Sequence, residues 1–502
     1  MIAEQTRQTP RPVRRPRVDF LPEEKASNVK QVEKVKLSAS KQDLLGNFFM
    51  LVVLVLGYTV KPCHWRWGQF QMARKRSLVL APRELGKSLI LTVSYIIWLI
   101  LNNPNIRILI VSNSSSAASK MLAGIVSHFE NNKILRAIFG DFIAGGRCNT
   151  EAFTTGKRTA VGLREATISI VGVYGTIVSG HFDVIIADDL CDFENTRTKP
   201  QRDKMWSWLW MVLMPTLESN EEHPEKDGSI HFIGTRYHHD DLYGRLIGKA
   251  EEPGAYWDNH LRDQALVGIG MAASLDIKDL RMEEMRTLWP EKKSIQRLLK
   301  IRKDSGSIIF GLQYQNDAEG TKGRIFQMDW FIHRYDIIPE NCMIFAGTDL
   351  AVKQDDSADF FTIVVIAVDP VTKHIYILDG VKIRLTAPKQ LDRIKQFYQT
   401  WKFVTCGIES VAYQEALVQW AVETTDVPVR GVTRHSDKVL RAYKIQHFFE
   451  NGKVFLPHGG KFVDLVDEMV LFPDGEHDDW FDALETAIDV AFSGNFNFAF
   501  AA

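Results

Sequence analysis

The sequence predicts two α/β domains in tandem. From about residue 44 to residue 312, short apolar runs alternate with helical patterns, which is typical of a mostly parallel sheet covered by helices. Beyond residue 323 the order changes, because three apolar runs follow one another closely before helical patterns return. The chain has 502 residues, of which 45% are hydrophobic and 25% charged, so its length and composition fit two or three globular cores.

The expected strands can be located one by one from these apolar runs. In the first domain we expect them at residues 77–81, 106–111, 168–171, 184–187 and 230–234. In the second domain we expect a meander and then two strands beside helices, at residues 343–348, 362–368, 374–378, 403–408 and 427–432. Small polar residues at 316–323 indicate a linker. The predicted divisions are an arm at 1–43, domains at 44–315 and 336–492, a linker at 316–335 and a tail at 493–502.

Charge and composition exclude several classes of protein. With 61 basic and 62 acidic residues the net charge is −1, so a uniformly basic nucleic-acid coat and an acidic disordered protein are both excluded. Five arginines among the first 18 residues predict a mobile arm, which could contact phosphates or remain solvated. Five cysteines without a C-x-x-C pair favour a reducing compartment. Residues 44–60 are uncharged, but their glycines and asparagine favour a buried core element over a membrane span.

A phosphate-binding loop is predicted after the first strand. The segment Arg83-Glu-Leu-Gly-Lys87-Ser88 joins an apolar strand to a long helical pattern. In a P-loop the backbone N–H groups cradle phosphates, lysine reaches the β- and γ-phosphates, and serine binds Mg²⁺. Ala81 stands where such loops usually carry their first glycine. The flanking strand and helix nevertheless favour nucleotide binding over an ordinary loop.

Further strands of the first domain end in residues suited to the same chemistry. Asp188 and Asp189 follow the strand at 184–187, where the first acid would hold Mg²⁺ and the second would orient the attacking water. The alternative is a turn with solvated acids. Thr235 and Arg236 follow the strand at 230–234 and could sense the γ-phosphate, and Arg83 could stabilise transition-state charge. Either arginine could equally form a surface salt bridge.

Carboxylates also end several elements of the second domain. Asp349 follows one strand, Glu409 follows another, and Asp478, Asp479 and Asp482 open a helix. Such acids suit two Mg²⁺ or Mn²⁺ ions about 4 Å apart that clamp the oxygens of a phosphodiester. The alternative for Asp478 and Asp479 is helix capping. A further acidic cluster at Asp355, Asp356 and Asp359 follows the first of these strands. Lys438 and Arg441 could bind phosphate or lie on a solvated helix face.

In combination, these motifs resemble the large terminase subunit of tailed bacteriophages, the ATP-driven motor and nuclease that packages viral DNA. The similarity runs from about residue 44 to residue 490. It implies a RecA-like P-loop ATPase domain followed by an RNase H-like nuclease domain. The residues that carry it are Arg83–Ser88, Asp188-Asp189, Gly234–Leu242, Gln313–Asn316, Thr348-Asp349, Gly407–Glu409 and His477–Ala483.

The resemblance also implies roles for particular residues. ATP would be bound by Arg83, Glu84, Leu85, Gly86, Lys87, Ser88, Asp188 and Thr235, with Mg²⁺ held by Ser88 and Asp188. Asp189 and Arg83 fall at catalytic positions of the ATPase. Asp349, Glu409 and Asp479 fall at the nuclease acids that bind two Mg²⁺ or Mn²⁺ ions, with Asp478 as the alternative within its pair. Trp67, Gln69 and Gln71 are candidates for contacting adenine.

The partners implied by the resemblance are double-stranded DNA, a portal protein and a small terminase subunit. A homo-oligomeric ring on the procapsid, in the host cytoplasm and without a membrane, would be the working form. The main rival is a P-loop helicase or repair ATPase–nuclease, which would need further helicase motifs or a second RecA domain. A transposase-like recombinase would leave the P-loop and Asp188-Asp189 unexplained. A virion structural protein would leave both acidic sites unexplained.

Overall fold

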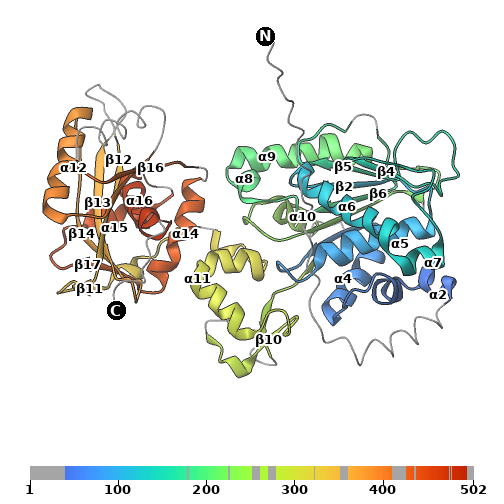
Figure 1. Cartoon of the computed structure of the whole chain (residues 1–502), viewed down its shortest axis with the longest axis horizontal. Coiled ribbons are helices and arrows are strands. Elements are labelled where there is room, and N and C mark those ends of the chain that lie inside the picture. Colours follow the sequence, from blue (N-terminus) through green and yellow to red (C-terminus); the bar gives the residue numbers. More distant parts are fainter. Residues whose placement is uncertain are drawn as a thin grey trace, which may run out of the picture.

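The structure is a computed structural model with an N-terminal and a C-terminal domain on either side of helix α11 (Figure 1). The predicted arm up to residue 39, the tail from residue 494, and the acidic cluster Asp355, Asp356 and Asp359 lie outside the described residues. The structure describes residues 40–177, 180–223, 226–250, 260–269, 279–321, 323–350, 360–409, 426–434, 437–473, 475 and 477–493.

An eight-stranded sheet with the order β3-β4-β5-β2-β6-β7-β1-β8 forms the centre of the N-terminal domain. The strands from β5 to β8 are parallel, and β3 and β4 add an antiparallel edge. The strands are β1 (Arg76–Leu80), β2 (Ile108–Ser112), β3 (Arg147–Cys148), β4 (Ala152–Thr154), β5 (Ile168–Gly172), β6 (Val184–Asp188), β7 (Ser229–Gly234) and β8 (His260–Arg262). The five strands predicted for this domain therefore all exist.

Helices cover both faces of this sheet, which explains why its strands are continuously apolar. Ile108 and Ile110 of β2 face one hydrophobic cluster, whereas Leu109 and Val111 face the other. The helices are α2 (Lys41–Gly46), α3 (Phe48–Met50), α4 (Pro62–Met72), α5 (Tyr95–Asn102), α6 (Ser115–Asn131), α7 (Lys133–Phe139), α8 (Phe193–Thr196), α9 (Lys199–Trp208) and α10 (Leu242–Ala250). The uncharged stretch 44–60 packs into the first cluster. Among the described residues, no helix has the length and apolar character that crossing a bilayer requires.

Helix α11 (Ile295–Tyr314) connects the domains and changes direction at Gly306. Gly306 has a φ of +82°, which favours glycine, and an added Cβ would lie 3.3 Å from Gln446 Oε1. Before the bend, Leu298 packs beside a small sheet of β9 (Leu266–Gly268) and β10 (Met285–Thr287). After the bend, Ile308 and Leu312 join the core of the C-terminal domain. The segment expected as a linker, 316–335, adds four buried side chains to that core, Ala318, Ile325, Phe326 and Phe331.

The C-terminal domain contains a seven-stranded sheet with the order β11-β17-β14-β13-β12-β15-β16. Its strands are β11 (Arg334–Tyr335), β12 (Met343–Asp349), β13 (Phe361–Val368), β14 (Ile375–Ile383), β15 (Thr405–Glu409), β16 (Val429–Val432) and β17 (Val454–Pro457). The strands β12 to β14 form the predicted antiparallel meander, and β15 pairs with β12 in parallel. The strands β12 and β15, which carry Asp349 and Glu409 at their ends, are therefore neighbours.

Helix α16 (Asp479–Ser493) lies directly on β12, β13 and β15. Gly347 permits this close approach, because a Cβ there would lie 2.2 Å from the backbone nitrogen of Ala487. The same face of the sheet carries α14 (Lys438–Glu450) and α15 (Val463–Leu471), and the opposite face carries α12 (Ala387–Trp401). The packing places the start of α16 beside the carboxyl ends of β12 and β15.

Candidate active sites

The predicted phosphate-binding loop lies between β1 and the π-helical segment Leu89–Ser94. Glu84 and Gly86 have φ values of +62° and +84°, so the loop makes a tight turn that glycine at position 86 makes without strain. The backbone N–H of Arg83 donates to Gln313 O at 3.0 Å, and His64 Nε2 lies 2.7 Å from Leu85 O. Contacts from outside the loop therefore fix its shape.

Lys87 and Asp189 form the charged pair of this site. Lys87 is buried, and its Nζ lies 3.2 Å from Asp189 Oδ2. Asp189 follows β6 with a φ of +49°, and its other oxygen, Oδ1, is buried without a hydrogen-bond partner among the described residues. The pair thus joins the loop to the end of β6 and leaves a carboxylate oxygen free to accept a proton or a water.

Asp188 is fully buried next to this pair. Ser88 Oγ and Thr92 Oγ1 donate hydrogen bonds to its two carboxylate oxygens at 3.1 and 2.6 Å. Burial, together with the negative charge of Asp189, raises the pKa of Asp188 to about 7. A carboxylate in this setting fits a divalent cation, which would compensate for its lost hydration. The sequence did not single out Thr92, although it stands one helical turn after Ser88.

Thr235 and Arg236 follow β7, which lies between β1 and β6. Thr235 is buried at the end of this strand. Arg236 instead pairs with Asp241 at 3.0 Å and donates to the carbonyls of His238 and His239. The buried ion pair within its own loop is therefore the role that the structure gives to Arg236.

The other loop side chains differ in exposure. Arg83 is exposed and available to a ligand. Glu84 pairs with Lys293, and this contact lowers the pKa of Glu84. The buried Leu85 anchors the loop in the hydrophobic core.

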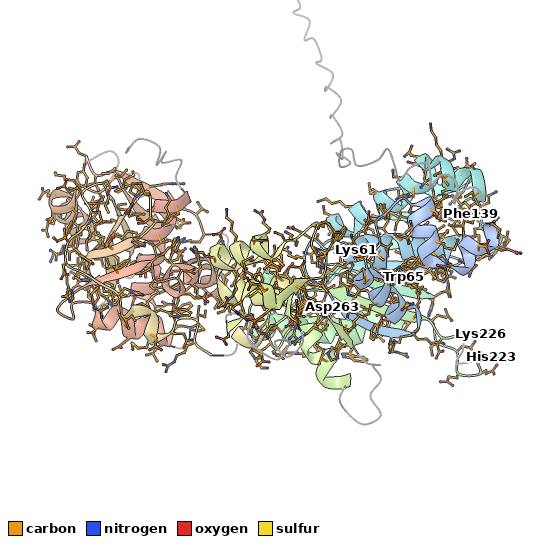
Figure 2. The ribbon with its side chains drawn as sticks, turned by 90° about the horizontal axis from the view of Figure 1, so that it is seen from below. Lys61, Trp65, Phe139, His223, Lys226 and Asp263 are labelled. Carbon is orange, nitrogen blue, oxygen red and sulfur yellow. The ribbon has the colours of Figure 1, made fainter. Side chains whose placement is uncertain are left out.

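Two of the three candidates for contacting adenine are buried and form hydrogen bonds within the protein. Trp67 is fully buried and donates from Nε1 to Oδ2 of Asp263 at 2.6 Å (Asp263 is labelled in Figure 2). Gln71 is buried and donates to Leu91 O at 2.9 Å. Gln69 is exposed on the same helix. Of the three, only Gln69 has its side chain open to solvent.

The acids predicted for the second site lie at one edge of the C-terminal sheet. Asp349 ends β12, Glu409 ends the adjacent β15, and Asp479 begins α16. Burial raises the pKa of Asp349 to about 8, and the negative charges of Asp482, Asp479 and Glu409 add to the effect while Lys438 opposes it. The structure therefore brings Asp349, Glu409 and Asp479 into one electrostatic cluster and adds Asp482 to it.

Lys382 is the counter-ion of Asp479. Its Nζ lies 2.7 Å from Asp479 Oδ2 and 2.8 Å from Glu468 Oε2. Glu468 also accepts a hydrogen bond from the backbone N–H of Trp480 at 2.6 Å, so it caps the first turn of α16. Neither Lys382 nor Glu468 was predicted as a site residue, because both reach the site from distant segments.

Lys438 and Arg441 are the counter-ions of the remaining acids. Lys438 Nζ lies 2.6 Å from Asp478 and 2.5 Å from Asp482. Arg441 is buried, and its guanidinium pairs with Asp482 at 2.9 Å and with Glu485 at 2.6 Å. The alternative of a solvated helix face is wrong for the buried Arg441, whereas the side chain of Lys438 is 41% exposed and also pairs with carboxylates. Asp478 and Asp479 are also distinguished, because each binds a different lysine.

The donor set of this site suits hard divalent cations, since it consists of carboxylates. A cation would also favour the ionised form of Asp349, whose pKa burial raises. Within the part of the chain that the structure describes, however, no three His, Cys, Asp or Glu side chains are gathered closely enough to hold a metal. The ammonium groups of Lys382 and Lys438 contact three of the acids instead.

Comparison of sequences identifies the second domain. The terminase RNase H-like domain family matches residues 346–490. The large terminase subunit of Enterobacteria phage T3 is 32% identical over 136 residues, which are 26% of this chain and 22% of that protein. The matched region thus spans about a fifth of the length of that curated relative.

Comparison of structures extends the likeness to both domains. A structure of the large terminase from a thermophilic bacteriophage covers 86% of this chain and 99% of its own, with a TM-score of 0.50 and 8% identity. Another structure of that terminase, in complex with ATP-gamma-S, has the same coverage and TM-score with 9% identity. The predicted α/β fold of both domains is therefore confirmed, and the second domain matches the RNase H-like domain of terminases.

Proposed function

We propose that the chain is a large terminase subunit, a packaging ATPase and nuclease. It would move double-stranded DNA into a procapsid and cut concatemeric DNA when packaging begins and ends. The observation that carries this proposal is the presence of two separate acidic centres in one chain. One lies beside a phosphate-binding lysine, with Lys87 3.2 Å from Asp189, and the other lies at the end of the RNase H-like sheet. The helicase and recombinase alternatives are not favoured, because the whole-chain likeness is to a large terminase.

For the ATPase site we propose that the loop from Arg83 to Ser88 binds the phosphates of ATP. The structure of the thermophilic phage terminase in complex with ATP-gamma-S supports a nucleotide at this site. Ser88 and Asp188 would hold Mg²⁺, which would neutralise charge on the phosphates when bound. Asp189 would accept a proton from the attacking water at its unpartnered Oδ1.

The remaining polar side chains of the ATPase site would stabilise charge and report hydrolysis. Lys87 would move from Asp189 toward the phosphates, and the exposed Arg83 would stabilise charge that develops on them. Thr235, at the end of the strand between β1 and β6, would sense the change in the nucleotide.

For the nuclease site we propose Asp349, Glu409 and Asp479 as the principal acids. They would hold two Mg²⁺ or Mn²⁺ ions, which supply an activated water and stabilise the leaving oxygen when bound. Asp478 remains the alternative ligand beside Asp479. Lys382 would orient Asp479 through a 2.7 Å contact, and Lys438 would orient Asp478 and Asp482 through its ion pairs with both.

The remaining proposals follow from the family. We infer a portal protein and a small terminase subunit as partners, a homo-oligomeric ring on the procapsid, and action in the host cytoplasm. The domain boundaries 44–315 and 336–492 are proposed on the same basis. Because a packaging motor must release DNA at each step, we expect its DNA contacts to be made to phosphates and to weaken with salt.

A paired experiment tests both activities in the full chain. Lys87→Ala should abolish DNA-stimulated ATP hydrolysis while Mn²⁺-dependent cleavage of plasmid continues. Asp349→Ala should abolish cleavage while ATP hydrolysis continues. Lys120→Ala and Asp336→Ala, at exposed positions outside both sites, serve as matched controls. Full ATPase activity of Lys87→Ala would refute the ATPase assignment, and plasmid cutting by Asp349→Ala would refute the nuclease assignment.

A further inference from the structure

An ion pair joins the ATPase domain to the helix that carries the nuclease counter-ions. Arg197 follows α8, and its Nε lies 3.2 Å from Asp437 Oδ2. Asp437 is the N-cap of α14, and its side chain accepts from the backbone N–H of Val439 at 3.2 Å. The side chain of Asp437 is 19% exposed and that of Arg197 is 39% exposed. Arg197 thus contacts the residue that starts α14.

The next residue of α14 reaches the nuclease acids. Lys438 is bonded directly to the N-cap Asp437, and its Nζ lies within 2.6 Å of both Asp478 and Asp482. Arg441, one turn further along, pairs with Asp482 from the same helix. A shift of the first turn of α14 would therefore move Lys438 relative to the acids that it holds.

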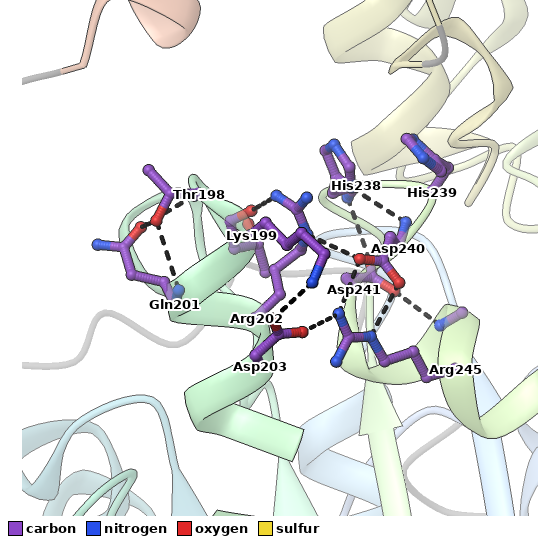
Figure 3. Close-up of polar contacts among 12 residues, drawn as sticks. Thr198, Lys199, Gln201, Arg202, Asp203, His238, His239, Asp240, Asp241 and Arg245 are labelled. Carbon is purple, nitrogen blue, oxygen red and sulfur yellow. Dashed lines mark hydrogen bonds and ion pairs between the residues drawn. The ribbon is translucent and has the colours of Figure 1, made fainter. Parts of the chain in front are cut away.

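On the ATPase side, Arg197 is tied to the loop after β7. Arg202 donates to the carbonyls of Thr196 and Arg197 at 2.9 and 3.3 Å, and its Nε donates to Asp240 at 3.1 Å. Asp240 lies five residues after Thr235, and Arg245 binds both Asp240 and Asp203 (Figure 3). Arg202 therefore connects the backbone at Arg197 to the loop that begins at the end of β7.

An apolar contact runs parallel to these ion pairs. Phe193 of α8 packs against hydrophobic clusters of both domains. Its ring meets that of Tyr237 edge to face, with 4.9 Å between centroids. Since Tyr237 also belongs to the loop after β7, α8 is fixed to that loop by two independent contacts.

From this arrangement we propose that Arg197 is a positioning residue for the nuclease. By holding Asp437, it fixes the first turn of α14 and thus keeps Lys438 between Asp478 and Asp482. Because the loop after β7 holds the backbone at Arg197, a change at the nucleotide site reaches the nuclease acids through this ion pair. The inference rests on the proposed function and extends it, since it makes an ATPase-domain residue part of the nuclease.

The experiment compares full-length variants for Mn²⁺-dependent plasmid cleavage, with and without a non-hydrolysable ATP analogue. Arg197→Ala should slow cleavage about three- to fivefold, the factor expected for a partly exposed ion pair, and should remove the effect of the analogue. Asp437→Asn keeps an N-cap but loses the charge, so it should match Arg197→Ala. The double variant should lose no more than either single one.

Two further variants show whether the effect is specific. Arg197→Lys retains a cation and should recover part of the cleavage rate and of the response to the analogue. Lys199→Ala removes an ion pair to Asp203 within helix α9, and it should cleave like the wild type. DNA-stimulated ATPase activity should be unchanged in Arg197→Ala, because Arg197 has no role at the nucleotide.

The outcomes separate this inference from the proposed function. If the wild type neither hydrolyses ATP nor cuts DNA, the proposed function fails and this inference fails with it. If the wild type cuts but Arg197→Ala cuts equally and still responds to the analogue, only this inference is overturned. It is also overturned if Arg197→Ala loses ATPase activity together with cleavage, or if the double variant shows additive losses.

Discussion

The proposed ATPase site and the proposed nuclease site balance buried carboxylates in different ways. In the ATPase site, Asp188 is held by two neutral hydroxyl groups, those of Ser88 and Thr92. In the nuclease site, Asp482 is held by two cations, Lys438 and Arg441. Hydroxyl groups leave the negative charge uncompensated and ready for a cation, whereas ammonium and guanidinium groups already compensate it. We therefore expect the two sites to respond differently when a carboxylate is neutralised.

The largest expected effect comes from neutralising Asp482. Asp482→Asn would leave the buried Arg441 and the partly exposed Lys438 short of a partner, so the free energy of unfolding should fall by about 3 kcal/mol. Chemical denaturation of the full chain, followed by a probe in the C-terminal domain, measures this loss. Asp188→Asn is the matched change in the other site, and it should abolish ATP hydrolysis without lowering the free energy of unfolding. Equal destabilisation by both variants would contradict the comparison.

The next effect is a pH dependence of stability in the metal-free protein. The pKa of Asp349 is raised to about 8, so between about pH 4 and pH 8 the folded state holds a proton that the unfolded chain releases. Stability should therefore fall as the pH rises through this window, by up to a few kcal/mol. Asp349→Asn removes this dependence, so its Tm should exceed that of the wild type more at about pH 8 than at about pH 5.

For Asp188, the pH range over which stability should fall ends at a lower pH, because the pKa of Asp188 is raised only to about 7. The stabilising effect of Asp188→Asn on the metal-free protein should thus stop growing near that pH. Thermal unfolding of the two variants across the same buffers makes this comparison. A Tm difference for Asp349→Asn that does not vary with pH would show that this carboxyl is not protonated in the folded state.

Removing Lys382 should have a smaller effect. Lys382→Met keeps the apolar part of the side chain but leaves Asp479 and Glu468 without their shared cation, which should cost about 2 kcal/mol of stability. Cleavage should slow as well, because Asp479 is no longer oriented. Lys461→Met is the control, since Lys461 is half exposed and its pair with Asp379 should contribute less than about 1 kcal/mol. Equal losses in the two variants would contradict a specific role for Lys382.

The smallest expected effect concerns the phosphate-binding loop. Lys293 pairs with Glu84, whose side chain is 60% exposed, so solvent screens much of this contact. Lys293→Ala should change the KM for ATP by less than about fivefold and leave kcat unchanged, as expected for a pair worth at most about 1 kcal/mol. Steady-state ATPase kinetics test this. A large loss in kcat would show that Lys293 acts on the reaction itself.

Local sequence patterns were sufficient to predict the strands and the acids at their ends. The strand before the phosphate loop, expected at 77–81, is observed at Arg76–Leu80, and the strand before Asp349, expected at 343–348, is observed at Met343–Asp349. These predictions succeeded because an apolar run that is buried on both faces is a local property. The acid that follows such a run is recognisable for the same reason, since it stands at the edge of the core.

The partners of those acids could not be predicted in the same way. Thr92 was detectable in principle, because it stands one helical turn after Ser88 and binds the same carboxylate. Lys382 and Glu468 carry no such signal, as they are 86 residues apart and meet only when β14 and α15 pack together. For the same reason, the sequence left Lys438 and Arg441 open to phosphate binding or a solvated helix face and did not indicate their carboxylate partners.

The sequence by itself determined two α/β domains, their strands and the acids at the two candidate sites. It could do so because apolar periodicity and the ends of strands depend only on residues that are close together in the chain. Only the tertiary structure decided which cation stands beside which acid. It also decided that Arg197 reaches Asp437 across the domain boundary. Ion pairs of this kind depend on segments that are far apart in the chain, and charged side chains have no periodicity that reveals a distant partner.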